Sequence, residues 1–354
     1  MTVVSESDLE EFRDSVRAAL AEVSPPAKVR AVMAGETGFD PDTWRVVATQ
    51  LELAGLMLPE ALGGGGMSMA EFAVAVEECG AALLCSPLFA TSVLAVPLLL
   101  ELGDESYSRA IAAGTLHATV AFGEGVTATP AGDGWRLTGT VVNVVDGATA
   151  GLVLVVASTP GDARAVFAVS GGFSREPLVT LDQTRKMATL SFADTEATLV
   201  GPADAGGALA RAAAVSRTLL AAESTGVAQR ALDLVVAYAK TRLQFGRLIG
   251  SFQAVKQRLA DALIEVESAR SAVYAAARST GDELERNSRI AAIMATEAAE
   301  HVTAECIQLH GGIGFTWEHD AHLYFKRART SASLLGTVDE HVAALADILD
   351  RETV

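Results

Sequence analysis

Apolar residues recur with the period of an α-helix from about residue 205 almost to the end of the chain. The clearest row consists of Phe252, Val255, Leu259, Leu263 and Val266. The pattern predicts three long helices at about 207–241, 251–280 and 284–309, followed by shorter ones. Long helices joined by short connections pack as antiparallel bundles. We therefore expect residues 204–354 to form a C-terminal helical bundle.

The middle of the chain, residues 116–203, consists instead of short β-rich runs separated by Gly, Asp and Pro. The expected strands lie at about 119–122, 135–145, 152–157, 165–169 and 188–192. Their spacing predicts a middle antiparallel β-domain, a small sandwich or barrel. Residues 1–115 have a helical period divided by Pro and Gly breakers, which predicts an N-terminal helical domain. The helical, β, helical order lacks βαβ alternation and predicts a multi-domain α+β fold rather than a Rossmann sheet.

Composition narrows the classes of function. The 354 residues are 50% hydrophobic and 20% charged, enough apolar surface for a folded core. The formal net charge of −17 repels nucleic acid and anionic lipid, so neither nucleic acid nor membrane is an expected partner. Acidic residues replace the basic start of a secretory signal, and we expect a cytoplasmic protein. Three cysteines without zinc spacing, and His319 and His322 without a remote partner, predict no metal site.

Two segments carry candidate ligand chemistry, and each has a structural alternative. Residues 242–256 interrupt two helices with Arg242, Phe245 and two glycines. They could form a plain helix hairpin, or offer a guanidinium for pyrophosphate beside a ring for stacking. Residues 311–314 place three glycines directly after a helix, where a helix cap explains at least one of them. Close approach of a ligand to the main chain is the other use of such glycines.

Both segments resemble the C-terminal bundle of the flavin-dependent acyl-CoA dehydrogenases. The matching motifs are Arg242-x-Gln244-Phe245-Gly246-x3-Gly250-x-Phe252-Gln253-x2-Lys256 and Gln308-x2-Gly311-Gly312-x-Gly314-Phe315. Ala54-Gly55-Leu56-Met57-Leu58-Pro59-Glu60, followed by Gly63-Gly64, resembles the N-terminal domain of the same family. The likeness covers nearly the whole chain, and the domain order of the family is the one predicted above.

The resemblance implies FAD as cofactor, held between subunits. The residues that would hold the adenosine and pyrophosphate of a neighbour's FAD are Arg242, Phe245, Gln308, Gly311 and Gly312, with Thr337 as a further cofactor contact. The family's flavin-ring loops correspond to residues 121–125 and 143–147. Here the first loop is shortened, and the tryptophan and hydroxyl of the second are absent. The resemblance thus implies one complete and one degraded half of the FAD site.

The catalytic base of the family is a glutamate that precedes a Gly-Thr pair near the C-terminus. Spacing from Glu318 to Gly336-Thr337 places Leu335 at that position, and leucine cannot accept a proton. Some members carry the base on the first bundle helix beside an arginine that corresponds to Arg217, a substrate-binding candidate. Glu223, two helical turns beyond Arg217, is a weak candidate for a relocated base. The alternative is a polar helix residue satisfied by a neighbour.

These features lead to one expected function and two alternatives. The first is a FAD-dependent acyl-CoA dehydrogenase subunit that completes a shared FAD site for α,β-dehydrogenation of an acyl-CoA, in fatty-acid or steroid side-chain oxidation. Its expected partners are the acyl-CoA, a homologous catalytic subunit or a second copy in a dimer or tetramer, and an electron-transfer acceptor. The second is a self-sufficient homo-oligomeric dehydrogenase whose base is Glu223 or Glu340. The third is a flavin-free scaffold that binds CoA thioesters or assists assembly.

Overall fold

The computed structural model describes residues 6–353 and divides them into two compact units. Unit 1 joins the chain up to residue 29 with residues 69–84 and 217–354. Unit 2 comprises residues 30–68 and 85–216. The three predicted domains at 1–115, 116–203 and 204–354 stay a prediction, and residues 1–5 and 354 of them lie outside the described chain. Within residues 6–353, no helix combines the length and apolar character needed to cross a membrane.

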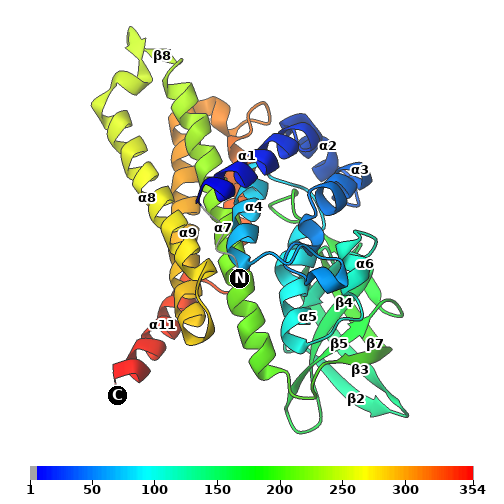
Figure 1. The fold of residues 1–354 in the computed structure, drawn as a ribbon. Helices are drawn as coiled ribbons and strands as arrows, with labels where there is room; N and C mark the ends of the chain where they lie inside the picture. The colour runs from blue at the N-terminus through cyan, green and yellow to red at the C-terminus, as the bar shows by residue number, and fades with distance from the viewer. Residues whose placement is uncertain (1–5, 354) are drawn as a thin grey trace. The chain divides into compact units, whose positions relative to one another are not determined.

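Unit 1 is helical and confirms the predicted C-terminal bundle (Figure 1). Its elements are α1 (Glu6–Val23), α4 (Met69–Ala81), α7 (Gly206–Ala239) from residue 217 onward, β8 (Leu243–Gln244), β9 (Arg247–Leu248), η5 (Ile249–Ser251), α8 (Gln253–Ala277), α9 (Gly281–His310), η6 (Gly311–Phe315), α10 (Ala321–Ser331) and α11 (Val338–Thr353). The long helices α8 and α9 pack side by side, and the β8–β9 hairpin lies at the end of the bundle between α7 and α8.

The buried face of α8 is shifted from the predicted row. Leu263 exposes 48% of its surface, so its expected place in the core is wrong. The buried stripe consists of Ala262, Val266, Ala269, Val273, Ala276 and Ala277. Small side chains allow α8 and α9 to pack closely, which favours the alanine stripe over the larger leucines. The larger apolar residues Leu263 and Ile264 are left on the outer face.

Helices α4 and α7 cross at two glycines. A Cβ atom on Gly226 would lie 2.7 Å from the carbonyl carbon of Glu77, and one on Gly80 would lie 2.9 Å from that of Glu223. Real Cβ atoms essentially never come so close to backbone. Both positions therefore require glycine, and this contact fixes α4 against the middle of α7.

Charged side chains of α4 are buried beside that crossing. Glu77 and Glu78 expose 3% and 6% of their surfaces, and Arg13 of α1 exposes 7%. Arg13 Nη1 donates to Glu78 Oε1 at 3.0 Å, and Arg270 Nε of α8 donates to Glu77 Oε1 at 2.9 Å. Tyr274 also hydrogen bonds Glu77, at 3.3 Å. This Glu77–Glu78 network joins three helices that are far apart in the sequence.

Unit 2 contains short helices and the β-domain. Its elements are α2 (Pro26–Ala34) from residue 30 onward, α3 (Pro41–Arg45), η1 (Val46–Gln50), η2 (Leu53–Gly55), η3 (Glu60–Leu62), η4 (Phe89–Ala95), α5 (Val96–Leu102), α6 (Ser108–Ala112), β1 (Ala118–Ala121), β2 (Val126–Ala131), β3 (Gly134–Val145), β4 (Leu152–Ser158), β5 (Arg164–Val169), β6 (Ser174–Leu178), β7 (Met187–Val200) and the start of α7. The breakers act locally: Pro26 starts α2, and Gly63 with φ of 83° ends η3.

The β-domain is mostly antiparallel, as predicted, with two parallel pairings in which β1 and β2 each lie beside β4. Strands β4, β2, β3, β7 and β5 pair in that order, and β5 returns to β4, so the pairings close into a ring. Its interior is apolar and includes Leu137, Val153, Phe167 and Leu190, each at most 1% exposed. The expected small barrel therefore surrounds one core.

Candidate functional site

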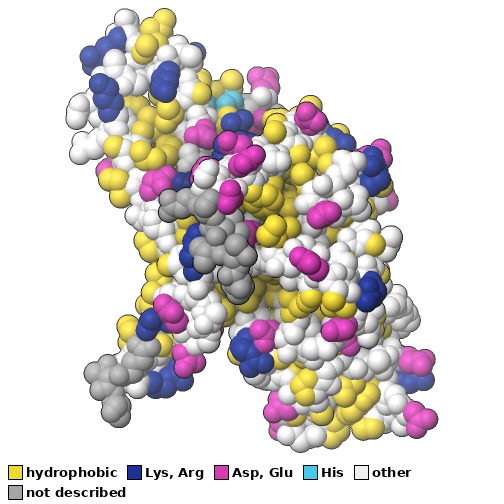
Figure 2. Space-filling model, viewed as in Figure 1, with side chains coloured by type: hydrophobic (Ala, Val, Ile, Leu, Met, Phe, Trp, Pro, Cys, Tyr) yellow, Lys and Arg dark blue, Asp and Glu magenta, His cyan; other side chains and the backbone are white. Residues whose placement is uncertain are grey.

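The hairpin between α7 and α8 presents an exposed aromatic ring. Its two strands are joined by only Phe245 and Gly246, whose φ angles are 54° and 77°. A two-residue turn with positive φ at both positions matches the twist of the strands, although it strains any residue other than glycine. Phe245 is nevertheless placed there with 91% of its surface exposed. The fold thus holds an apolar ring away from its own core, and Figure 2 shows basic side chains gathered at the same tip.

Neighbouring side chains hold this tip in place. The ring of Phe252 meets that of Phe245 edge-on at 6.2 Å, and the Arg247 guanidinium lies 3.8 Å above the Phe252 ring. The backbone of Arg242 is fixed by two hydrogen bonds, one to Tyr238 and one from Ile249, both 2.9 Å. Its exposed side chain is left to reach a ligand.

The glycine segment after α9 lies at the same end of the bundle, because the Tyr238 ring of α7 packs on the His310 ring of α9 at 4.4 Å. Gly311 has φ of 66° and caps α9. A Cβ on Gly314 would lie 3.0 Å from the carbonyl oxygen of Ile307, so packing requires this glycine. Gly312 differs: its φ is not positive, and a Cβ there would meet no atom of the described residues within 4 Å.

Neither packing nor backbone conformation within residues 6–353 requires glycine at position 312. Close approach of a ligand to the main chain would explain it. Gln308, one turn earlier, and Gly311 are exposed beside it. An open glycine pair, an exposed amide, an exposed ring and an exposed guanidinium are groups that can contact a flat, anionic dinucleotide. The residues at this end of the bundle thus fit the adenosine and pyrophosphate of FAD.

The loop between α10 and α11 contains Leu335, which the resemblance aligns with the catalytic glutamate of the family. Leu335 is half-buried with φ of 58°, a left-handed conformation that is uncommon for leucine. Thr337 and Glu340 form a capping box that starts α11. The Thr337 N–H donates to Glu340 Oε2 at 2.8 Å, and the Glu340 N–H donates to the Thr337 hydroxyl at 3.3 Å. The N–H and the hydroxyl of Thr337, which donates to Glu340 Oε2 at 3.1 Å, together lower the pKa of Glu340, the opposite of what a general base requires.

Arg217 lies in a buried cluster with α9 and the start of α11. It exposes 6% of its surface, donates to Glu285 at 2.5 Å and contacts the Ser288 hydroxyl at 3.2 Å. Arg289 also pairs with Glu285, and its Nη1 lies 3.4 Å from His341 Nδ1. Burial, followed by the charges of Arg217 and Arg289, lowers the pKa of His341 to about 4. The Arg217 charge is therefore matched by Glu285, and its role toward substrate stays a prediction.

Glu223 is joined to a buried arginine. It exposes 5% of its surface and accepts a hydrogen bond from Arg327 Nη1 of α10 at 3.0 Å, while Arg327 exposes only 1%. The carboxylate thus supplies a counter-charge to an arginine buried in the same core. The geometry favours the structural interpretation of Glu223.

The two flavin-ring segments lie in the β-domain. Residues 122–125 connect β1 to β2 in four residues, and Phe122 is 37% exposed. Asn143 has φ of 59° where the β3–β7 register shifts, and the Asp146 N–H donates to the Lys186 carbonyl at 2.9 Å. The first segment is the shortened loop, and the second lacks the tryptophan and hydroxyl of the family, so the degraded half of the FAD site stays a prediction.

Sequence reasoning missed the partners of the buried charges, above all Arg327, Glu285 and the Glu77–Glu78 network. The network could have been suspected from two adjacent acids inside the apolar segment 72–81, because buried acids require partners. Arg327 and Glu223 are 104 residues apart, and nothing local connects them.

Comparisons with known proteins match most of the chain. The family model described as acyl-CoA dehydrogenase, N-terminal domain, matches residues 6–115, and that of the C-terminal domain matches residues 207–349. A relative named acyl-CoA dehydrogenase IpdE2, from Mycobacterium tuberculosis, is 38% identical over 324 residues, covering 92% of each chain. A variant of the Tcur3481–Tcur3483 steroid ACAD has a TM-score of 0.88 and 31% identity over 98% of this chain and 99% of its own.

The ChsE4–ChsE5 complex from Mycobacterium tuberculosis is also similar in structure. Its matching chain has a TM-score of 0.90 and 28% identity, with 99% of both chains covered.

Proposed function

The chain belongs to the acyl-CoA dehydrogenase family, whose members are FAD-dependent oxidoreductases, and on that premise we propose that it completes a FAD site shared with a second, catalytic subunit. The observation that carries the proposal is the loop between α10 and α11. The resemblance aligns Leu335 with the base of the family, and the two candidate replacements are engaged elsewhere, Glu340 in capping α11 and Glu223 with Arg327. A chain with an apolar residue there depends on another subunit for proton removal.

The half-site residues have separable roles in this proposal. Arg242 would neutralise pyrophosphate oxygens, Phe245 would cover the adenine face, and Gly311 with Gly312 would let the cofactor approach the main chain. Bound FAD supplies the acceptor for the hydride that leaves the acyl β-carbon. Because Phe245 extends 91% exposed from the bundle, these groups suit a cofactor held mainly by another chain.

The proposed substrate is an acyl-CoA thioester with a steroid-derived acyl group. Support comes from the relatives: one similar structure is a steroid ACAD, and another is a complex of two proteins. The −17 net charge gives a CoA ester no general electrostatic attraction, so its binding must depend on local contacts.

The decisive experiment is to purify the chain alone and together with an acyl-CoA dehydrogenase encoded beside it. We expect a stable complex that retains FAD and oxidises substrate, whereas the lone chain does neither. Full FAD occupancy and turnover by the lone chain would refute the shared site. A complex without a flavin absorption spectrum would favour the flavin-free scaffold instead.

A further inference from the structure

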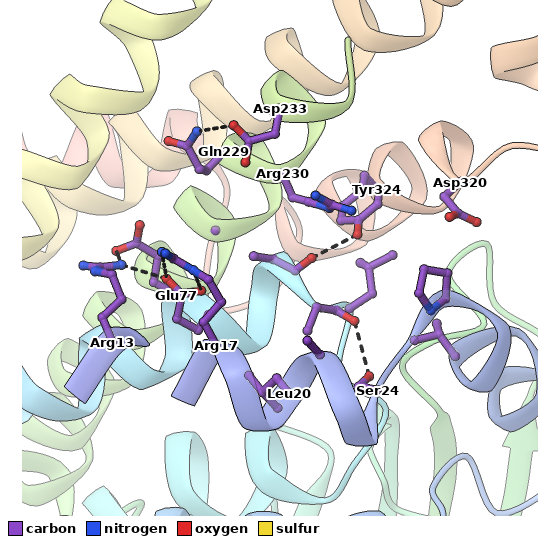
Figure 3. A pocket seen from close by; sticks show the side chains of 18 of the residues that line it. Arg13, Arg17, Leu20, Ser24, Glu77, Gln229, Arg230, Asp233, Asp320 and Tyr324 are labelled. Carbon is purple, nitrogen blue, oxygen red and sulfur yellow. Dashed lines mark hydrogen bonds and ion pairs between the residues drawn. The ribbon is translucent and has the colours of Figure 1, made fainter. Parts of the chain in front are cut away.

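A cavity of about 740 Å³ lies within unit 1, away from the half-site residues (Figure 3). Helices α1, α4, α7, α8 and α10 line it. Its volume is in the range of small-molecule sites, about 300–1,000 Å³. Arg13, Arg17 and Glu77 lie toward one end of the view, and Arg230 and Tyr324 toward the other. None of the residues proposed to contact FAD lines this cavity.

Three of the four arginines of the lining are paired with carboxylates. Arg17 donates two hydrogen bonds to Glu78, at 3.0 and 2.9 Å, and Arg13 shares that carboxylate. Arg270 is held by Glu77. These arginines are neutralised by the protein itself and have little remaining capacity to bind an anion.

Arg230 is the exception in the lining. Within the described part of the chain it forms no ion pair of the kind that holds the other three, and Figure 3 shows it beside Tyr324. Tyr324 is 5% exposed and donates to the Ala81 carbonyl at 2.9 Å, and burial raises its pKa to about 12, so the phenol stays neutral. Among the described residues, the Arg230 guanidinium therefore lines the cavity without a direct ion pair, although Asp233 and Asp320 belong to the same lining.

The rest of the lining limits what can bind. Leu20, Val29, Leu83 and Leu323 offer apolar contact near the polar groups. The lining has four arginines but six acids, namely Glu10, Glu77, Glu78, Asp233, Glu267 and Asp320. One negative charge can be held at Arg230, whereas a second would face this acidic excess. Phosphate esters and CoA are thereby disfavoured.

We propose that this cavity binds a small organic monoanion, a free carboxylic acid with an apolar body, whose carboxylate pairs with Arg230 beside Tyr324. Such a site shares no lining residue with the proposed FAD contacts or with Arg217, and it needs no flavin. The planar guanidinium can accept a carboxylate through two parallel hydrogen bonds. The apolar body would lie along α1 and α10.

Octanoate is the probe, titrated into the full chain, in complex with its partner where one is needed, by isothermal calorimetry. Arg230→Gln should weaken octanoate binding by about tenfold or more, because a charge-assisted pair is lost. Arg258→Gln is the matched control: this exposed α8 arginine outside the cavity should leave binding unchanged. Ala21→Phe, which fills the cavity from α1, should also abolish binding.

Competition with octanoyl-CoA and a comparison with octyl phosphate test whether octanoate binds in this cavity. Saturating octanoyl-CoA should leave octanoate binding unchanged, and octyl phosphate should fail to bind. Displacement of octanoate by octanoyl-CoA would overturn the proposal, because the probe would then occupy the substrate site. Unchanged affinity of Arg230→Gln, equal binding of octyl phosphate, or no octanoate binding at millimolar concentration would overturn it as well.

Discussion

Replacing Glu223 with glutamine tests whether its carboxylate has a structural or a catalytic role. The carboxylate is 5% exposed and its partner Arg327 is 1% exposed, so the substitution removes a negative charge that pairs with a buried guanidinium. Removing one member of a buried pair costs about 3–5 kcal/mol, and because the glutamine oxygen can still accept one hydrogen bond, we expect a loss of about 2–4 kcal/mol. Urea unfolding of the purified chain measures this loss.

Two further variants test the reasoning. Glu300→Gln breaks a more exposed pair with Arg329 and should change the free energy of unfolding by at most about 1 kcal/mol. The double variant Glu223→Leu/Arg327→Met removes both buried charges and should recover much of the lost stability. If Glu223→Gln unfolds at the wild-type urea concentration but abolishes flavin reduction by substrate in the complex, Glu223 is the base and the structural interpretation fails.

Three other outcomes are expected. Arg242→Ala should weaken FAD retention by the complex about ten- to a hundredfold, measured as FAD left after dialysis, and unchanged retention would contradict the motif match. Gly312→Ala should lower FAD retention but leave stability within about 0.5 kcal/mol, whereas Gly226→Ala should cost about 1–3 kcal/mol or more; equal urea midpoints would contradict the packing described. His341 has a folded pKa of about 4, below its ordinary value of 6.5, so its contribution to stability is complete above pH 6.5 and is lost as pH falls toward 4. His341→Gln should flatten the pH dependence of the unfolding free energy in that window, and an unchanged slope would exclude the effect.

The helical bundle was predictable because long amphipathic segments carry a strong periodic signal. The strands β2 and β6 were not predicted, since Pro130 interrupts the pattern of one and the other, Ser174–Leu178, has mostly exposed side chains. Such strands are specified by their neighbours through backbone hydrogen bonds, which leave little trace in hydrophobicity. Leu263 was misplaced for a related reason: the period identifies a helix, but the choice of buried stripe depends on the facing helix.

Motif likeness predicted where a ligand could bind more readily than which groups are free to react. Arg242, Phe245 and Gly312 lie on exposed turns, as a shared ligand site requires. The availability of Glu223 and Arg217 depended on Arg327 and Glu285, partners distant in the sequence. Charge pairs between distant segments form only in the folded chain, so local sequence patterns do not predict them.

The Glu77–Glu78 network also constrains how the chain can be synthesised. Glu77 emerges from the ribosome early, but its partner Arg270 lies 193 residues further on. Until α8 is made, the acids of α4 lack one of their counter-charges, and burying them is costly. Unit 2, whose residues 85–216 are completed before α8 begins, can fold first. Unit 1 can therefore complete its assembly only after residue 270 has been synthesised. In a nascent chain stalled before that residue, α4 should remain sensitive to protease.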